Sequence, residues 1–203
     1  MWVSSALREL DSSALRHLYG GSHVGALTWA MIGVTVLGGG WGMLGLVPLL
    51  GWARSRHFAA SLTLVLLTAA GVVFELKRVF GRVRPCFVVP GVRALWGSPT
   101  DYSFPSGHTA GSFTFATFVV TFFWLRRPRS RIELGASVAV VLFAACVGVS
   151  RIYLGVHFAS DVLGSALLGT FFGVAGAFLW NAVNPQRRAC SPSRKSASRP
   201  VRW

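Results

Sequence analysis

The stretch Ser150–Asp161, SRIYLGVHFASD, joins two long apolar segments of the chain. It contains a permanently charged arginine, Arg151, and a histidine, His157, which is followed four residues later by Asp161. If these residues are helical, a spacing of four places His157 and Asp161 on one face, where they can hydrogen-bond. The stretch therefore predicts a connection between two helices that holds an anion-binding arginine beside a reactive histidine.

The composition around this stretch is that of a membrane protein. Hydrophobic residues make up 53% of the 203 positions, and charged residues make up only 13%. The formal net charge of +14 fits nucleic acid or anionic lipid as a partner, and the long apolar runs favour lipid. The 6 acidic residues are scattered and the 3 cysteines are widely spaced, so neither a metal site nor a disulfide framework is predicted.

Several apolar segments have the length of a membrane-spanning helix, since about 20 residues rising ~1.5 Å each cross a hydrocarbon core of ~30 Å. A less regular segment, residues 24–52, is interrupted by three consecutive glycines at 38–40. It either crosses the membrane once or has its first half at the surface. The sequence thus predicts an all-α integral-membrane helical bundle with four clear spans plus a fifth from this segment. The clear spans are residues 57–76, 107–125, 132–149 and 161–180.

The N-terminal stretch before residue 24 has leucines at helical spacing, which predicts a helix lying in the membrane interface. Asp11, followed by two serines, is expected to cap the second half of this helix. A frayed terminus is the alternative. The leucines are Leu7, Leu10, Leu15 and Leu18.

The domain organisation follows from these segments. Residues 1–183 are expected to form one membrane-embedded domain with its core at residues 55–180. Residues 184–203 are rich in Pro, Ser, Arg and Lys, which predicts a basic, disordered tail.

A second polar stretch, KRVFGRVRP, follows the first clear span. Lys77 and Arg84 are seven residues apart, about two helical turns, so they face one point if the helix continues. A structural interpretation is equally simple, because basic side chains commonly reach the interface from the ends of spans.

A third polar stretch, Pro105–His108, opens the next expected span. Ser106 and Gly107 place backbone N–H groups at a helix N-terminus, which is a ready anion site, and Gly107 allows an anion to approach closely. A plain capping turn is the structural alternative. Together the three stretches supply cations, backbone donors and two histidines, His108 and His157, which suits phosphoryl transfer without a metal ion.

The basic residues outside the spans indicate an orientation. The clear spans place all three polar stretches on one side of the membrane, and the other side carries twice as many Lys and Arg residues. Because basic residues collect in cytoplasmic loops, the polar stretches are expected outside the cytoplasm. The protein is therefore predicted in the cell (inner) membrane, with its C-terminal tail in the cytoplasm.

The three polar stretches contain the motifs K-x6-RP, PSGH and SR-x5-H-x3-D. In residue type, spacing and order the chain resembles the type 2 phosphatidic acid phosphatase superfamily, the integral-membrane lipid phosphate phosphatases related to vanadium haloperoxidases. The resemblance covers about residues 55–180, and the N-terminal part matches less well. The motifs are Lys77 through Arg84-Pro85, Pro105–His108, and Ser150-Arg151 through His157 to Asp161.

This resemblance implies a role for each motif residue. His157 would be the nucleophile that forms a phosphohistidine, and Asp161 would hold its ring in the reactive tautomer. His108 would be the general acid that protonates the leaving alkoxide and then activates water. No metal or other cofactor is implied. The phosphate would be bound by Lys77, Arg84, Ser106, Gly107 and Arg151.

The implied reaction is metal-independent hydrolysis of a phosphate or diphosphate ester of a membrane lipid. The implied partners are that lipid and the bilayer, without nucleic acid, and the sequence leaves the oligomeric state open. Phosphatidic acid, phosphatidylglycerophosphate and a polyprenyl diphosphate all remain candidate substrates.

Three alternatives remain open. A membrane phosphotransferase would pass the phosphoryl or phosphoalcohol group to an acceptor other than water with the same residues. An anion channel would need polar groups in the middle of its spans, where this sequence has almost none. A nucleic-acid or lipid-surface binder would use the basic tail, which lacks the interleaved aromatic residues typical of nucleic-acid binding.

Overall fold

The computed structural model describes residues 5–21, 24–53, 56–97, 99–125 and 130–183, and the regular structure in them is α-helical. This confirms the predicted all-α class. The predicted tail, residues 184–203, lies outside the described residues. The helices are α1 (Ser5–Leu18), α2 (Ala26–Gly38), α3 (Gly40–Ala53), α4 (Arg56–Phe80), α5 (Pro85–Val88), α6 (Gly107–Trp124), α7 (Arg131–Tyr153) and α8 (Ala159–Val183).

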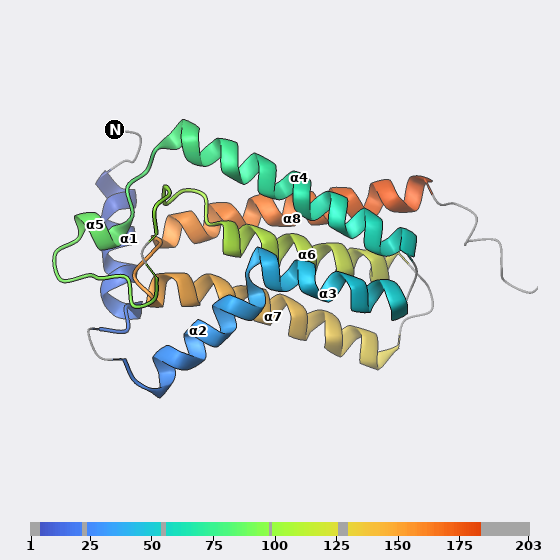
Figure 1. Cartoon of the computed structure of the whole chain (residues 1–203), viewed down its shortest axis with the longest axis horizontal. Coiled ribbons are helices and arrows are strands. Elements are labelled where there is room, and N and C mark those ends of the chain that lie inside the picture. The colour runs from blue at the N-terminus through green and yellow to red at the C-terminus, as the bar shows by residue number, and fades with distance from the viewer. Residues whose placement is uncertain (1–4, 22–23, 54–55, 98, 126–129, 184–203) are drawn as a thin grey trace, which may run out of the picture.

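The long helices α4, α6, α7 and α8 lie side by side in a bundle, with α6 in contact with α3, α4, α7 and α8 (Figure 1). This central helix carries hydroxyl side chains that are buried among its neighbours. Ser112 donates to the backbone oxygen of Thr109, and Thr114 donates to that of Ala110. Because α6 bonds its own hydroxyl groups, its polar residues fit inside an apolar bundle.

Three helical segments are long and apolar enough to cross a membrane, which supports the predicted membrane bundle. They are Arg56–Val88, Arg131–Tyr153 and Ala159–Val183. The pair Ala26–Gly38 and Gly42–Pro48, bent by 50°, adds a fourth if it forms one broken span. The helix predicted as the span 107–125 is present as α6 but has only 18 residues and is not among these segments. The number of spans stays a prediction.

The break predicted at the three glycines is confirmed, since α2 ends at Gly38 and α3 begins at Gly40. A Cβ atom at Gly38 would lie 2.0 Å from Val147 of α7, and one at Gly39 would lie 2.8 Å from the His108 ring of α6. Because these glycines have no side chain, the bend between α2 and α3 packs in direct contact with α6 and α7.

Gly169 and Gly173 of α8 lie against the backbone of α6. A Cβ atom at Gly169 would lie 2.4 Å from the backbone oxygen of Ala110, and one at Gly173 would lie 2.5 Å from that of Thr114. With no side chain at either position, the backbone of α8 packs tightly on α6. This contact fixes the two helices whose first turns carry His108 and Asp161.

An aromatic cluster closes the bundle around Phe122. Its ring centroid lies 4.5 Å from that of Phe58 and 5.0 Å from that of Trp180, both in edge-to-face geometry. Each such pair stabilises the fold by about 0.5–1.5 kcal/mol beyond the area it buries. The cluster ties α4, α6 and α8 together.

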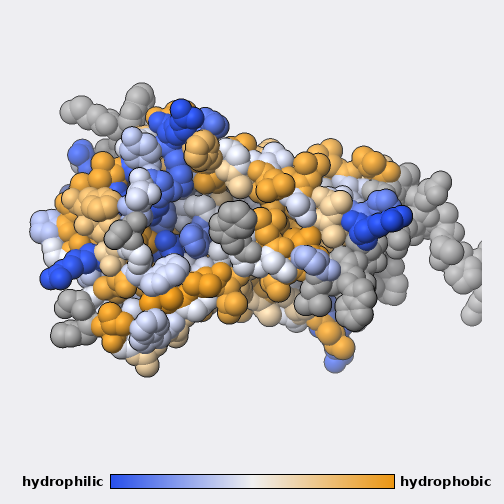
Figure 2. Space-filling view, viewed as in Figure 1, coloured by the Kyte–Doolittle hydropathy of each residue, from blue (hydrophilic) through white to orange (hydrophobic). Residues whose placement is uncertain are grey.

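The outer surface of the bundle is apolar. Large hydrophobic side chains are exposed along α4 and α8, including Leu64, Leu67, Leu163, Leu167 and Phe171. Figure 2 shows hydrophobic residues along the length of the molecule and hydrophilic residues gathered toward the end where α1 and α5 lie. Such an apolar belt is suited to lipid, and the polar end is suited to water.

The N-terminal helix is present as α1, but the role predicted for Asp11 is wrong. Asp11 lies in the middle of one continuous helix, and this residue is 2% exposed because its side chain bonds Arg82 and Ser160. The buried Leu15 packs against Ile152 and Phe158, so α1 is docked at the end of the bundle. Its position in the membrane interface remains a prediction.

Candidate active site

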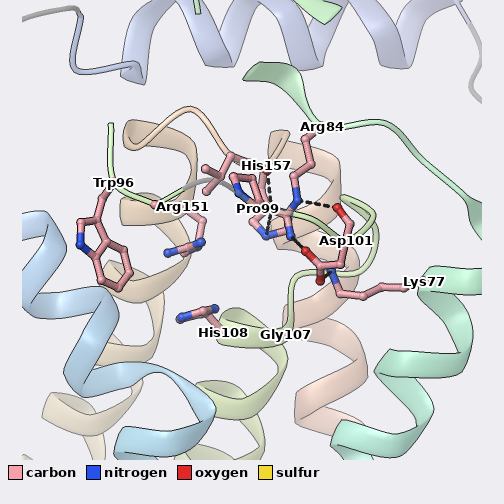
Figure 3. Close-up of a pocket in the computed structure, with 11 residues that line it drawn as sticks. Lys77, Arg84, Trp96, Pro99, Asp101, Gly107, His108, Arg151 and His157 are labelled. Carbon is pink, nitrogen blue, oxygen red and sulfur yellow. Dashed lines mark hydrogen bonds and ion pairs between the residues drawn. The ribbon is translucent and has the colours of Figure 1, made fainter. Parts of the chain in front are cut away.

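A cavity of about 270 Å³ lies at the polar end of the bundle. It is lined by residues of all three motifs, which the chain contributes from α4, the α4–α5 connection, the start of α6, the end of α7 and the connection before α8. Figure 3 shows Gly107 and His108 on one side of it and His157 and Arg84 on the opposite side. The lining residues are Lys77, Arg84, Trp96, Gly97, Pro99, Asp101, Gly107, His108, Arg151, Val156 and His157.

Lys77 and Arg84 converge, but not through a continuing helix. The helix α4 ends at Phe80, and Gly81 has a φ of 55°, a left-handed conformation that favours glycine and turns the chain. Both side chains then reach Asp101: the Lys77 Nζ atom is 2.9 Å from Oδ2, and the Arg84 Nη2 atom is 2.5 Å from Oδ1. Tertiary structure, rather than helical periodicity, brings the two cations together.

Asp101 is a cavity residue that sequence reasoning missed. Burial alone would raise the pKa of its carboxyl group, but the hydrogen bond from Lys77 and the charge of Arg84 outweigh burial and lower the pKa to about 2. The side chain is nevertheless 54% exposed. An ionised carboxylate therefore occupies the cationic site while remaining open to solvent. The one available signal was that Asp101 is the only acidic residue between α5 and α6.

His157 is buried and neutral. Burial lowers its pKa to about 3, and the positive charges of Arg84 and Arg151 add to this effect against the opposing influence of Asp161. Its Nε2 atom lies 3.0 Å from Arg84 Nη1, and a guanidinium group can only donate. Nε2 is therefore the acceptor, so Nδ1 carries the ring proton. The lone pair of Nε2 is the one on the arginine side of the ring, toward the cavity.

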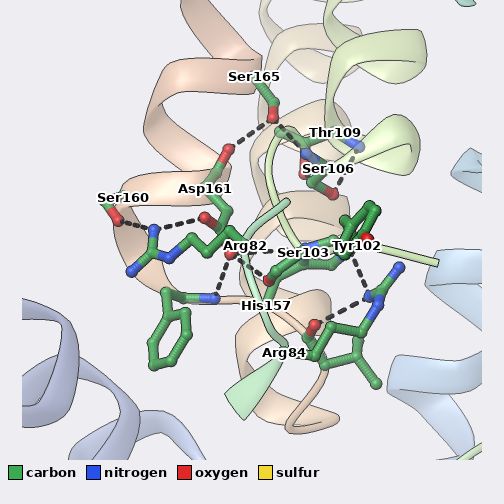
Figure 4. A network of polar contacts seen from close by, with 12 residues as sticks. Arg82, Arg84, Tyr102, Ser103, Ser106, Thr109, His157, Ser160, Asp161 and Ser165 are labelled. Atoms are coloured by element: carbon green, nitrogen blue, oxygen red, sulfur yellow. Dashed lines mark hydrogen bonds and ion pairs between the residues drawn. The ribbon is translucent and has the colours of Figure 1, made fainter. Parts of the chain in front are cut away.

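The predicted contact between His157 and Asp161 is present in a different form. His157 lies before α8 and only Asp161 lies in its first turn, so the two do not share a helical face. Nδ1 and Oδ2 are 3.7 Å apart, beyond hydrogen-bond distance. The hydroxyl of Ser103 donates to Oδ2 at 2.5 Å and lies 3.4 Å from Nδ1 (Figure 4). Asp161 therefore reaches the ring through Ser103, which sequence reasoning also missed.

The carboxylate of Asp161 is fixed from two further directions. Oδ2 also accepts from the backbone N–H of Phe158 at 2.9 Å, and Oδ1 accepts from Arg82 Nη1 at 2.6 Å. Asp161 has no exposed surface, so this carboxylate is fully desolvated and fully bonded. Arg82 lies inside the K-x6-RP segment, but nothing in the motif distinguished it from the neighbouring basic residues.

Arg151 lies in the last turn of α7 beside the cavity. Its Nη1 atom donates to the Thr35 hydroxyl of α2 at 2.7 Å. Its buried Nε atom has no hydrogen-bond partner among the described residues. A buried donor without a partner is costly, and an anion in the adjacent cavity would satisfy it.

Ser106 is placed differently from its predicted role. It is the N-cap of α6, and its hydroxyl accepts from the hydroxyl of Thr109 at 3.0 Å. Its backbone N–H donates to Ser165 at 2.6 Å. The groups of Ser106 are thus engaged in joining α6 to α8, and Gly107 is the glycine that lines the cavity. As the first residue of α6, Gly107 has a backbone N–H with no acceptor inside the helix.

The site combines cationic groups with two histidines and is suited to a phosphoryl group. Arginine forks match phosphate oxygens, and donors fixed in a desolvated site stabilise the charge that develops during phosphoryl transfer. In the part of the chain that the structure describes, no three His, Cys, Asp or Glu residues gather as a metal site. The chemistry available from these residues is nucleophilic attack by histidine with acid–base help from the second histidine.

Comparison with known proteins extends this picture. The family model of the PAP2 superfamily matches residues 58–187. Phosphatidylglycerophosphatase B of Bacillus subtilis is 34% identical over 161 residues, which cover 74% of each chain. Undecaprenyl-diphosphatase of Sulfolobus acidocaldarius is 33% identical over 123 residues, 61% of this chain and 55% of that relative, so the chain spans about half of its length.

A solved structure is similar over most of the fold. The crystal structure of a PAP2-type phosphatidylglycerolphosphate phosphatase from Bacillus subtilis superimposes with a TM-score of 0.72 at 27% sequence identity. The superposition covers 90% of this chain and 88% of that one. The similarity therefore includes most of the helical bundle and is not confined to the motifs.

Proposed function

The chain belongs to the PAP2 superfamily, and we propose that it is a membrane phosphatase that hydrolyses a phosphate ester of a membrane lipid with His157 as the nucleophile. One observation carries the proposal. The Nε2 atom of a neutral, buried His157 faces the same cavity as Lys77, Arg84 and Arg151. This places the unprotonated nitrogen of a nucleophile where a phosphate would be bound.

Substrate binding begins with an exchange of anions. The phosphate displaces the carboxylate of Asp101 from Lys77 and Arg84, and the guanidinium group of Arg84 turns from His157 to the phosphate oxygens. This releases the Nε2 lone pair for attack. The unpaired Nε of Arg151 and the N–H of Gly107 supply further donors. Ser106 supports this arrangement as the cap of α6.

In the first chemical step, Nε2 of His157 forms a bond to phosphorus while the bond to the lipid oxygen breaks. His108 takes a proton from the bound phosphate monoanion and donates it to the leaving alkoxide, and the Nδ1 proton of His157 is held by Ser103 and Asp161. In the second step, His108 takes a proton from water, the resulting hydroxide attacks phosphorus and the P–N bond breaks. Inorganic phosphate leaves and the neutral imidazole is restored. Water is the natural acceptor because the site opens to solvent at Asp101.

The substrate is an amphiphilic phosphate monoester or diphosphate ester whose tail stays in the bilayer. The exposed apolar faces of α4 and α8 support this, since they would lie in lipid beside the cavity. The names of the two relatives point to phosphatidylglycerophosphate and to undecaprenyl diphosphate, and phosphatidic acid has the same phosphate chemistry. The generic apolar surface supports the class of substrate rather than one member of it.

We further propose that residues 1–183 form a single membrane-embedded unit in the cell (inner) membrane with residues 184–203 as a cytoplasmic tail. The cavity would face the extracytoplasmic side. The charge distribution in the sequence supports this orientation. The direction of α8 agrees with it, because this helix runs from the cavity end to the opposite end of the bundle (Figure 1).

A purified-protein assay tests the function. The full chain in detergent micelles is given phosphatidic acid, phosphatidylglycerophosphate and a polyprenyl diphosphate, and released phosphate is measured with and without EDTA and vanadate. We expect hydrolysis that persists in EDTA and is inhibited by vanadate, which mimics the trigonal transition state. A radiolabelled substrate should leave an acid-labile, alkali-stable label on the wild type that is absent in His157→Ala. Loss of activity in EDTA, or a label that persists in His157→Ala, would overturn the mechanism.

A further inference from the structure

Arg82 connects three acceptor groups that lie behind the catalytic histidine, and two of them, Asp11 and Asp161, are buried. Its guanidinium group donates to Asp161 Oδ1 at 2.6 Å, to Asp11 Oδ2 at 2.6 Å and to the Ser160 hydroxyl at 2.7 Å. It also lies 4.3 Å from the ring centroid of Phe158. This side chain is only 18% exposed, so several of its donors are committed to fixed protein acceptors.

We propose that Arg82 is a positioning residue for the reaction, and that α1 belongs to the active-site support because Asp11 holds Arg82 in place. The proposal rests on the phosphatase function proposed above. The described residues that line the cavity do not include Arg82, so it acts on the reaction through Asp161 and does not contact the substrate. We call Asp11, Arg82, Ser103, Ser160 and Asp161 the buried network.

The first step of the argument is the charge of Asp161. A carboxylate with no exposed surface has lost its hydration, and its ionised form persists only if bonded groups compensate for that loss. Arg82 is its cationic partner, while Ser103 and the N–H of Phe158 are neutral donors. Without Arg82 the carboxylate would rotate or take up a proton. In either case the Ser103 hydroxyl would lose its acceptor, and the His157 ring would lose its orientation.

The second step concerns Asp11, whose two carboxylate oxygens accept hydrogen bonds from three donors. Oδ1 accepts from the backbone N–H of Ser160 at 2.8 Å, and Oδ2 accepts from the Ser160 hydroxyl at 2.7 Å as well as from Arg82. Asp11 thereby joins α1 to the first turn of α8, one residue before Asp161. Because the second charged partner of Arg82 is the buried Asp11 and not solvent, the guanidinium group is kept in one orientation.

The third step concerns the position of α1 in the sequence. The family model begins at residue 58, so α1 lies before the matched region. Its contact with the bundle is specific as well as apolar, since the Asp11 bonds accompany the packing of Leu15 on Ile152 and Phe158. An N-terminal segment outside the matched family region therefore supplies part of the structure that orients the nucleophile.

The test uses the full-length protein with Arg82→Gln, Asp11→Asn and the double variant. Arg78→Gln is the matched control, because Arg78 is an exposed arginine at the end of α4, four residues before Arg82. In the described part of the chain its side chain lies over the Phe74 ring and takes no part in the buried network. We expect Arg82→Gln to lower kcat by about ten- to a hundredfold, since a charge-assisted hydrogen bond is lost. The Ki for inorganic phosphate should stay within about twofold, because the cavity donors are intact. Asp11→Asn should lower kcat several-fold.

The double variant separates a shared role from two independent ones. If Asp11 acts through Arg82, adding Asp11→Asn to Arg82→Gln should change kcat by less than it does in the wild type. Arg82→Lys should recover part of the loss, since one charged donor can still reach Asp161. The control should match the wild type.

Several outcomes would overturn the proposal. These are a kcat within twofold of wild type in Arg82→Gln, a parallel rise in the Ki for phosphate, or multiplicative effects in the double variant. If Arg82→Gln does not fold, Asp11→Asn and Arg82→Lys decide: wild-type kcat in both would remove the role of the network. Absence of hydrolysis in the wild type would instead be a failure of the proposed function, and the two failures are thus distinguishable.

Discussion

Two arginine–aspartate pairs on opposite sides of His157 have nearly the same geometry and different surroundings. On the cavity side, Arg84 lies 2.5 Å from Asp101, whose side chain is 54% exposed. On the buried side, Arg82 lies 2.6 Å from Asp161, which has no exposed surface. The two arginines are only two residues apart in the sequence. Bond length therefore does not distinguish the pairs, and exposure does.

Exposure decides which pair a substrate can open. When the Arg84–Asp101 pair opens, water can solvate the half-exposed carboxylate of Asp101, whereas the buried Arg84 needs another anion, which a bound phosphate supplies. Removing one partner of a buried pair costs about 3–5 kcal/mol, because the remaining charge is stranded. A phosphate can therefore take the place of Asp101 at Arg84, whereas Asp161 stays with Arg82 throughout the reaction. Asp101 is thus a replaceable partner of Arg84 in the cavity, and Arg82 with Asp161 is a fixed support for His157.

The largest effect is expected where the two sides meet. His157→Ala removes the group that receives the phosphoryl on one side and is oriented on the other, so we expect kcat to fall by about a thousandfold or more. Phosphate release from the best substrate of the panel measures this. His57→Ala is the control, since His57 is an exposed residue of α4 outside the cavity lining. Near-normal turnover in His157→Ala would contradict the assignment of the nucleophile.

The next largest effect is expected from a change to Arg84, the cation of the Arg84–Asp101 pair. Arg84→Ala removes a donor to the phosphate and to the transition state, and we expect kcat/KM to fall by about a hundred- to a thousandfold. The Ki for inorganic phosphate should rise in the same variant, unlike the expectation for Arg82→Gln. If Arg84→Ala lowered kcat while leaving the Ki for phosphate unchanged, the distinction between a binding side and a support side of His157 would be lost.

The cavity side was largely predictable from the sequence. Lys77, Arg84, Gly107, His108, Arg151 and His157 all belong to motifs, and all of them line one cavity. The fold was predictable where local chemistry determines it, as in the helix break at the three glycines and the packing of Gly169 and Gly173 on α6. These features depend on residues close in sequence or on one helix face, which a spacing argument can read.

The buried side was mostly not predictable, because its contacts are long-range. Asp11 and Arg82 are 71 positions apart, and Ser103 and Asp161 are 58 apart. No periodicity connects such residues, so local sequence patterns predict only a helix cap at Asp11 and give no signal for Ser103. The four-residue spacing of His157 and Asp161 also predicted the wrong local geometry. It suggested a shared helix face, whereas α8 begins only after His157.

A smaller effect is expected from Ser103→Ala, which tests the buried side without changing a charge. The His157 ring would keep Asp161 at 3.7 Å but lose the hydroxyl between them. We expect kcat to fall by about tenfold with KM nearly unchanged, since one hydrogen bond to a charged group is lost and no cavity donor is altered. Ser137→Ala is a matched control, because its hydroxyl bonds only within α7 in the described structure. A change in KM alone would place Ser103 on the binding side instead.

The smallest effect is expected from Asp101→Asn, and it has the opposite sign for anion binding. If the carboxylate competes with phosphate for Lys77 and Arg84, its removal should lower the Ki for inorganic phosphate and vanadate by several-fold, while kcat changes little. Asp101→Glu, which retains the charge, is the matched variant and should keep the wild-type Ki.

The pH dependence sharpens this last prediction. The pKa of Asp101 is lowered to about 2, so its carboxylate is ionised at every pH from about 4 to 9 and competes equally across that range. Titration of Asp101 should therefore add no pH dependence of its own to the ratio of the Ki values of wild type and Asp101→Asn, even though each Ki varies with the ionisation of phosphate itself. A Ki that rises in Asp101→Asn would mean that Asp101 holds Arg84 in its binding position. In that case the cavity pair would be a support like the buried one, and exposure would not be what distinguishes them.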